Sequence, residues 1–143
     1  LHDVLSTVLL DGKIVISCVS GLKPDFEGKT VGLPSELQIS VAEEIAQSAP
    51  GAKVVEAFNT TFAEILQSDS RDFHGQHPSI LFCGDDRSAK DVTATLIKDC
   101  GYDAIDVGTL QVARTLETFA TVWVQMAAVS QTFPNVAIKV LHR

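Results

Sequence analysis

The stretch ILFCGDDRSAKDVTATLIKDCGYDAIDVGTLQVARTLE, residues 80–117, decides the fold of this 143-residue chain. Residues 80–83 are a short apolar run that a glycine closes, as is typical of a strand buried on both faces. Apolar residues then recur at helical spacing up to Cys100, and Gly101 stands where a left-handed helix cap is expected. Residues 104–107 follow as a second strand. Strand, helix and strand in this order predict a βαβ unit, which implies a parallel sheet and a right-handed crossover.

Two aspartates, Asp85 and Asp86, stand between the first strand and the helix. Carboxylates in this place accept hydrogen bonds from the free N–H groups of a helix N-terminus, so we interpret the pair as caps. The alternative is a phosphoacceptor or metal site, as in a flavodoxin-like signalling domain. Asp106, at the end of the second strand, is expected to orient the loop that follows and not to act as a base.

The segments before this stretch continue the alternation of strands and helices. Residues 13–18 (KIVISC) are a β-branched run that predicts a central parallel strand. Residues 19–37 are rich in glycine and proline, and they predict a long loop at the edge where α/β folds place their ligands. The pattern Ser-Val-Ala-Glu from Ser40 to Glu43 predicts a helix that begins with a capping box.

Polar residues follow the next predicted strand, residues 53–58 (KVVEAF). Asn59, Thr60 and Thr61 are expected to cap a short helix over residues 62–67. Because Asn59 and Thr60 have short polar side chains at the end of a strand, they are also placed to hydrogen-bond a ligand at the sheet edge.

His74 and His77 lie in a polar loop, residues 67–78, with the spacing H-x-x-H. Zinc sites need three or four convergent ligands, and no cysteine or carboxylate stands at ligand spacing from this pair. We therefore interpret the loop as solvated and expect no metal site.

A long helix is predicted over residues 111–130, with a broad apolar stripe that packs on the sheet alone or on a partner as well. Arg114 and Glu117 are three residues apart and are expected to form a surface or interface pair. Residues 136–141 (VAIKVL) predict a final strand. The stripe consists of Ala113, Leu116, Ala120, Trp123 and Ala127, widened by Phe119, Val122 and Met126.

Composition fits one α/β domain over residues 1–143 and narrows its partners. The net charge is −7 and no basic cluster is present, which argues against nucleic acid or an anionic membrane as a partner. No apolar segment reaches the ~20 residues that a membrane span requires. We interpret Cys18, Cys83 and Cys100 as reduced, buried small residues of a cytoplasmic protein.

Several catalytic signatures are absent from the sequence. There is no G-x-G-x-x-G, no Walker-type loop, no G-x-S-x-G elbow and no Cys/His nucleophile pair. The residues alone therefore predict an α/β fold with ligand loops at the strand ends and no identifiable catalytic group.

A set of short segments agrees in order and spacing with a known family over nearly the whole chain. They are residues 12–16 (GKIVI), 40–46 (SVAEEIA), 50–55 (PGAKVV), 57–60 (AFNT), 84–86 (GDD), 106–108 (DVG) with Leu110, Ala113-Arg114, Leu116-Glu117 and residues 137–141 (AIKVL). Together they resemble the C-terminal portion of the deazaflavin-dependent NADP reductases. The pattern is similar also to the cytosolic oxidoreductase domains of the six-transmembrane metalloreductases.

The resemblance implies a partial Rossmann-type fold, with a mainly parallel sheet, flanking helices and a long C-terminal helix. It implies NADP as the cofactor and hydride transfer between nicotinamide and a flavin or 8-hydroxy-5-deazaflavin acceptor. In that family the glycine fingerprint lies in N-terminal βαβ units, so we expect this chain to be the C-terminal portion of a longer protein and to be inactive alone. The cofactors carry the chemistry in such enzymes, so no catalytic acid or base is expected.

The resemblance also implies a set of cofactor-binding residues on the nicotinamide side of the pocket. They are Val19 and Ser20 after the strand of residues 13–18, and Asn59, Thr60 and Ala63 after the next strand. Ser20-Gly21 replaces the usual Asn-Pro of the family, which changes the contacts to the nicotinamide face. Thr109 stands where the family often has proline, and this is expected to alter only a turn.

Three functions remain open from the sequence. The first is an NADP-dependent oxidoreductase with a small-molecule redox substrate and a homodimeric assembly. The second is a non-catalytic Rossmann-like module that serves dimerisation or binding. The third, ranked below these two, is a flavodoxin-like signalling domain that uses Asp85-Asp86.

Overall fold

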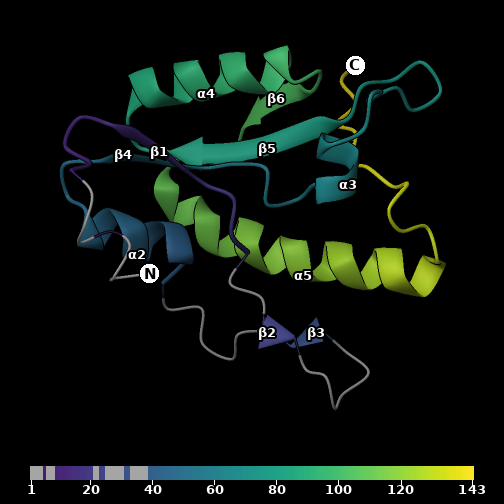
Figure 1. Ribbon diagram of the computed structural model, residues 1–143, viewed down its shortest axis with the longest axis horizontal. Coiled ribbons are helices and arrows are strands. Elements are labelled where there is room, and N and C mark those ends of the chain that lie inside the picture. The colour runs from purple at the N-terminus through teal and green to yellow at the C-terminus, as the bar shows by residue number, and fades with distance from the viewer. Residues whose placement is uncertain (1–4, 6–8, 21–22, 25–30, 33–38) are drawn as a thin grey trace.

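The computed structural model describes residue 5 and residues 9–20, 23–24, 31–32 and 39–143; for residues 23–24 and 31–32 it describes the backbone only. Four strands form one sheet with helices on both faces (Figure 1). The strands, in sheet order, are β1 (Ile14–Ser17), β4 (Lys53–Glu56), β5 (Ser79–Gly84) and β6 (Asp103–Asp106). The helices are α2 (Val41–Ser48), α3 (Ala63–Leu66), α4 (Arg87–Asp99), the 3-10 turn η1 (Leu110–Val112) and α5 (Ala113–Ser130). The predicted α/β class is confirmed.

The sheet is mainly parallel, as predicted, with one antiparallel pair. β1 pairs with β4 and β5 pairs with β6 in parallel, and the predicted βαβ unit is β5–α4–β6. β4 and β5 run antiparallel, with Glu56 opposite Cys83. The prediction of a central strand at residues 13–18 is wrong, because β1 lies at the edge of the described sheet. A run of β-branched residues indicates that both faces of a strand are covered. It does not indicate whether one or two other strands pair with it.

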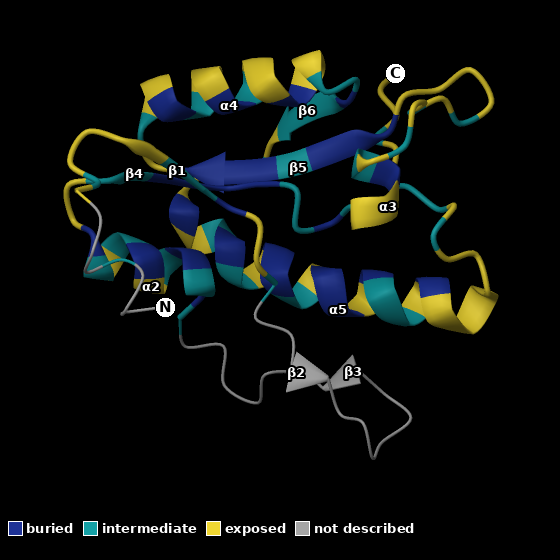
Figure 2. Cartoon of the chain, in the orientation of Figure 1, coloured by how far each residue is buried: buried dark blue, intermediate teal, exposed yellow. Residues whose placement is uncertain are grey.

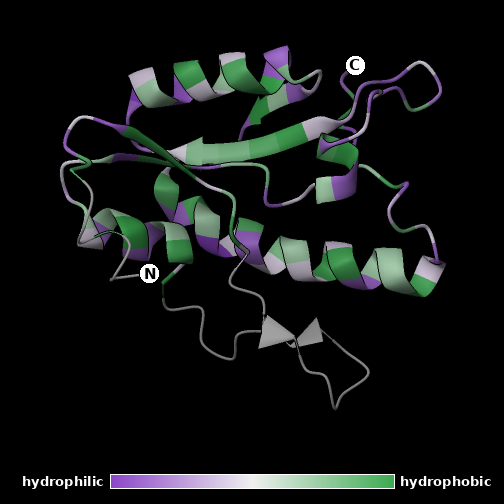
Figure 3. Cartoon of the chain, in the orientation of Figure 1, coloured by the Kyte–Doolittle hydropathy of each residue, from purple (hydrophilic) through white to green (hydrophobic). Residues whose placement is uncertain are grey.

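Successive residues of the central strands alternate between two core layers. Val55 and Phe82 pack with Ile97 of α4, while Val54 and Cys83 belong to the layer under α2 and α5. Figure 2 shows the buried sides of α4 and α5 turned toward the sheet, and Figure 3 shows that β5 is hydrophobic over most of its length. These two core layers pack on opposite faces of the strands whose carboxyl ends carry the candidate site.

The predicted cap of α4 is confirmed for Asp86 and is wrong for Asp85, which bonds the distant η1 turn instead. Asp86 Oδ1 accepts the N–H of Ala89 at 2.8 Å and so caps α4, while Asp85 Oδ1 accepts the N–H of Leu110 at 2.9 Å. Asp106 Oδ1 accepts the N–H of Gly108 at 3.0 Å, which orients the loop after β6.

The junction of α2 and α5 confirms one prediction and overturns another. Ser40 and Glu43 form the predicted capping box. Arg114 does not pair with Glu117, because it makes two 2.7 Å hydrogen bonds to the carboxylate of Glu43. Glu117 instead accepts the N–H groups of Val41 and Ala42 at the α2 N-terminus, at 3.1 and 3.2 Å. The spacing of residues along one helix predicts only partners on that helix. Here the partners of Arg114 and Glu117 come from a second helix, α2.

Three further expectations are wrong. The polar residues 59–61 do not cap α3, whose N-cap residue is Phe62 without a side-chain hydrogen bond. Residues 136–141 form no strand, although Ile138 O accepts the N–H of Ser79 at 2.7 Å, because this tail meets β5 at one point and does not run along it. Cys18 is exposed and not buried, because it follows the last residue of an edge strand.

The predicted loop over residues 19–37 lies partly outside the described residues. Within it the structure describes two short antiparallel strands, β2 (Lys23–Pro24) and β3 (Val31–Gly32), on the side of α5 away from the sheet (Figure 1). Of the helices that are described, none has the length and apolar character to cross a membrane.

Candidate functional site

The carboxyl ends of β1 and β4 meet at one edge of the sheet. The two strands are parallel with Ser17 opposite Glu56, and the N–H of Ala57 donates to Ser17 O at 2.9 Å. Residues 18–20 and residues 57–63 therefore leave the sheet side by side. The five predicted cofactor-binding residues lie on these two segments. The fold therefore brings them to the edge of the sheet where α/β folds place ligands.

The five residues differ in their surroundings. Val19 and Ala63 are exposed and Ser20 is half-buried. Asn59 is half-buried, yet both polar atoms of its side-chain amide are buried and have no hydrogen-bond partner among the residues that the structure describes. Thr60 is 2% exposed, and its hydroxyl also lacks a partner within the described part of the chain. Since buried polar groups almost always have partners, the amide and the hydroxyl are unusual and mark this segment as a candidate site.

The segment that carries Asn59 and Thr60 is held in a fixed conformation. Phe58 has a φ of +64°, in the left-handed region that a bulky residue rarely adopts. Phe62 stacks on Trp123 with ring centroids 5.8 Å apart and meets the edge of Phe133 at 5.0 Å. The aromatic contacts anchor the segment on α5, and strained backbone of this kind occurs where a site is preformed.

The sequence reasoning missed Glu56, which lies beneath these residues. It is 0% exposed, and neither carboxylate oxygen has a hydrogen-bond partner in the described part of the chain. Burial raises its pKa to about 8; the Ser17 hydroxyl opposes part of this rise, although their contact lacks hydrogen-bond geometry, and the charge of Glu117 adds to it. At neutral pH Glu56 is therefore mainly an uncharged acid. The signal in the sequence is a glutamate inside the apolar strand KVVEAF.

A polar row crosses the sheet at this level. Ser17, Glu56 and Cys83 are register partners on β1, β4 and β5, so their side chains share the face that α5 covers. Burial and the nearby Glu56 raise the pKa of Cys83 to about 12. Cys18 is exposed as a residue, but desolvation of its thiol and the charge of Glu56 raise its pKa as well. Neither thiol is activated as a nucleophile.

These groups fit the amide end of a nicotinamide cofactor. A carboxamide offers one acceptor and two donors, which match the free amide of Asn59 and the free hydroxyl of Thr60. The chain contains no glycine-rich phosphate loop, so its sequence provides no such cradle for a pyrophosphate. Among the described residues no group of three or more His, Cys, Asp or Glu side chains is placed to hold a metal ion.

Comparison with known proteins tests the predicted resemblance. No protein-family model matches the sequence. The structure is similar to a candidate F420-dependent NADP reductase from Arthrobacter sp. FB24, with a TM-score of 0.80 and 32% identity over 93% of this chain and 59% of that protein. It is similar also to a hypothetical protein from Sinorhizobium meliloti, with a TM-score of 0.67 and 28% identity over 82% of this chain and 56% of that protein.

A curated protein matches in sequence. Residues of this chain are 37% identical over 78 positions to Metalloreductase STEAP3 of Rattus norvegicus, which covers 54% of this chain and 15% of that protein. The chain thus spans less than two thirds of each of these relatives. The predicted resemblance is confirmed by the fold and sequence of the candidate F420-dependent NADP reductase and by the sequence of the metalloreductase.

Proposed function

We propose that this chain is part of an NADP-dependent oxidoreductase that transfers a hydride between nicotinamide and a flavin or 8-hydroxy-5-deazaflavin acceptor. The observation that carries the proposal is the buried amide of Asn59 and hydroxyl of Thr60, both without hydrogen-bond partners among the described residues, at the edge of the sheet where α/β folds place ligands. The similarity to a candidate F420-dependent NADP reductase supports the same cofactor pair. We expect a cytoplasmic location and a small-molecule redox substrate.

In this proposal the chain binds and orients the cofactors, and the cofactors themselves carry the electrons. Asn59 and Thr60 hold the carboxamide, while Val19, Ser20 and Ala63 flank the ring. Because the pKa of Glu56 is raised to about 8, this side chain keeps the floor of the site uncharged near neutral pH. No residue of the chain is assigned a catalytic proton transfer.

Binding of NADPH tests the proposal. Its dissociation constant is measured by calorimetry for this 143-residue chain and for the product of the same reading frame with any upstream coding region included. The double variant Asn59→Ala, Thr60→Val would lose two hydrogen bonds to the cofactor. We expect its dissociation constant for NADPH to rise by roughly tenfold or more. Thr95→Val, an exposed threonine on α4, is the matched control. Failure of both products to bind NADPH, or equal binding by variant and control, contradicts the proposal.

A second candidate function is a non-catalytic dimerisation module, and the exposed face of α5 favours it. Phe119, Val122, Met126 and Val129 are 37%, 59%, 45% and 71% exposed, and their spacing of 3, 4 and 3 is that of a coiled-coil seam. No charged residue occurs over residues 118–133, so two copies would meet there without repulsion. We propose a homodimer through this face.

Sedimentation tests the dimer. Met126→Lys is expected to convert the dimer to a monomer, whereas Val92→Lys, on an equally exposed apolar position of α4, should leave it unchanged. A wild-type chain that sediments as a monomer at high concentration refutes this assembly. A dimer that binds no NADPH would favour the module over the enzyme.

A further inference from the structure

Buried polar atoms without a hydrogen-bond partner are concentrated at one place in the described part of the chain. Six of the nine such side-chain atoms found there belong to Ser17, Glu56, Asn59 and Thr60. All four residues lie where β1 and β4 end, since Ser17 and Glu56 are the last register pair of these strands. Buried polar atoms seldom lack partners, so their concentration at one sheet edge indicates a function beyond core packing.

Glu56 is close along the chain to the residues that we propose hold the carboxamide. Asn59 follows it by three residues, and three residues span at most about 11 Å even in a fully extended chain. Phe58 has a φ of +64°, so the chain turns between them and is not fully extended. On the other strand, Val19 follows Ser17, the register partner of Glu56, by two residues. The carboxyl group therefore lies near the start of both segments that carry the proposed cofactor residues.

Glu56 makes no ion pair with any residue that the structure describes. The groups near it are Ser17 on β1, Cys18 after β1, Cys83 on β5 and Glu117 on α5. Burial raises the pKa of Glu56 to about 8, the Ser17 hydroxyl opposes the rise, and the charge of Glu117 adds to it. The carboxyl group therefore changes its charge within the physiological range of pH, with no basic side chain to compensate it.

The two forms of the proposed cofactor differ in the charge of the ring. The nicotinamide ring of NADP⁺ carries one positive charge and that of NADPH is neutral, whereas the phosphate groups are the same in both forms. A carboxylate near the ring attracts the oxidised form, while its repulsion of the phosphates is common to both forms. At about 10 Å in a partly buried site, one unit charge changes the relative affinity by on the order of tenfold.

We propose that Glu56 sets the preference of this site between the oxidised and the reduced cofactor. The inference rests on the proposed function and deepens it. While Glu56 is protonated, the site does not distinguish the two rings by charge; once it is ionised, the site favours NADP⁺. By reciprocity, NADP⁺ favours the ionised carboxyl, so its binding near pH 7.5 releases the proton of Glu56 from a fraction of the molecules.

The ratio of two dissociation constants tests the proposal. The constants for NADP⁺ and NADPH are measured by calorimetry at pH 6.5 and pH 9, on the 143-residue chain or on its upstream-extended product. The affinity for NADP⁺ relative to NADPH should rise by about tenfold, because Glu56 changes from mainly protonated to mainly ionised. The contribution of the phosphates cancels in the ratio. A ratio that does not change with pH overturns the proposal.

Two variants assign the effect to Glu56. Glu56→Gln keeps the shape of the protonated acid, so the ratio should stay at its low-pH value throughout. Ser17→Ala removes the hydroxyl that opposes the rise in the pKa of Glu56, so the midpoint of the change should move to higher pH. Wild-type pH dependence in Glu56→Gln, or an unmoved midpoint in Ser17→Ala, shows that another group is responsible.

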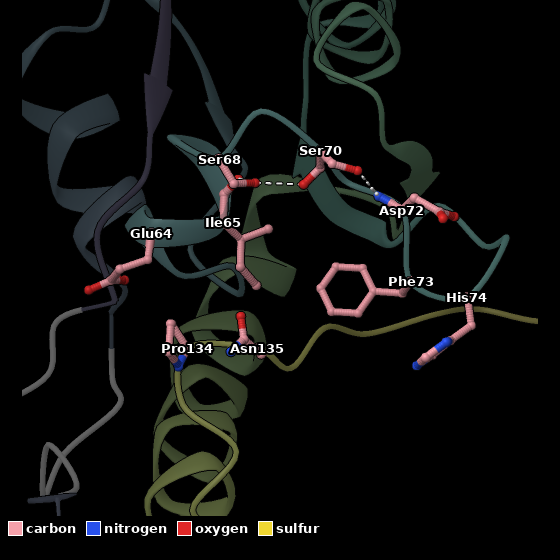
Figure 4. Close-up of a pocket in the computed structure, with 9 residues that line it drawn as sticks. All are labelled: Glu64, Ile65, Ser68, Ser70, Asp72, Phe73, His74, Pro134 and Asn135. Atoms are coloured by element: carbon pink, nitrogen blue, oxygen red, sulfur yellow. Dashed lines mark hydrogen bonds between the residues drawn. The ribbon is translucent and has the colours of Figure 1, made fainter.

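Glu64→Gln is the matched control. Glu64 is exposed and follows Ala63, one of the five proposed cofactor residues. Figure 4 shows its carboxylate turned away from Ile65 and Asn135, and these three residues belong to a separate hollow of about 460 Å³ beside α3. Because water and salt screen an exposed charge, this variant should keep the wild-type pH dependence of the ratio.

Proton release is a second readout. Heats of binding in buffers of different ionisation enthalpy at pH 7.5 should show more proton release with NADP⁺ than with NADPH, and Glu56→Gln should remove the difference. Failure of both cofactors to bind either product contradicts the proposed function, and this inference with it. Binding of both cofactors with the same pH dependence and equal proton release contradicts only the role of Glu56.

Discussion

Ser17 and Glu56 lie directly opposite one another on the parallel strands β1 and β4, and both side chains are buried without a hydrogen-bond partner among the residues that the structure describes. A buried carboxyl group without partners destabilises a fold when it is charged. The raised pKa of Glu56, about 8, lets the group stay protonated near neutral pH. A buried ionisable group with a strongly shifted pKa at the carboxyl end of a strand is typical of a functional site.

Replacing Glu56 should change how stability depends on pH. Because the pKa is about 8 in the folded chain and lower in the unfolded chain, the unfolded state loses its proton first as pH rises. The free energy of unfolding should fall between about pH 4.5 and pH 8, by on the order of 3–5 kcal/mol, and level off above. Glu56→Gln should remove this fall in urea unfolding at pH 5 and pH 8. Glu64→Gln, at an exposed position, serves as the control; an unchanged slope in Glu56→Gln contradicts the prediction.

The ion pair between α2 and α5 should show the opposite pH dependence. The Arg114 guanidinium lowers the pKa of Glu43 to about 2, so its stabilisation is present above about pH 4.5 and is lost as pH falls toward 2. Arg114→Met should lower the thermal midpoint at pH 7, and the difference from wild type should shrink at pH 3. Arg87→Met breaks the highly exposed pair with Asp91 and should have a smaller effect. Equal effects of the two changes would refute the importance of the helix junction.

The core layer under α4 should be sensitive at Ile97. This side chain is 0% exposed, so Ile97→Ala should reduce the free energy of unfolding by about 2–5 kcal/mol. The neighbouring Leu96 is 42% exposed, and Leu96→Ala should cost much less. Urea unfolding monitored by circular dichroism measures both. Similar losses from the two variants would show that α4 is not packed as described.

The three thiols should differ in their rates of reaction with a thiol reagent. Cys18 is exposed, Cys100 is half-buried and Cys83 is buried with its pKa raised to about 12. In the native protein Cys18 should react first and Cys83 only when the chain unfolds. The variant Cys18→Ser should lose the fast phase and keep the others. Rapid labelling of Cys83 in the native protein would contradict the burial of β5.

Short-range contacts explain what the sequence could predict. The capping box of Ser40 and Glu43 and the cap by Asp86 join residues three apart, and the strand–helix–strand order of residues 80–117 fixes the βαβ unit. These features depend on hydrogen bonds between residues close in sequence and on the spacing of apolar residues within one segment. The resemblance to NADP reductases also rests on such local segments, since their order is preserved along the chain.

The sequence by itself thus determined the α/β class, the caps of α2 and α4, the buried stripe of α5 and the segments that form the candidate site. Only the tertiary structure decided that β1 is an edge strand, that β4 and β5 run antiparallel, that Arg114 pairs with Glu43, and that Glu56 is buried without a hydrogen-bond partner among the described residues. The physical reason is distance along the chain. Strand neighbours, interhelical ion pairs and the desolvation of one carboxyl group depend on residues that the local pattern does not contain, and packing of the whole domain brings them together.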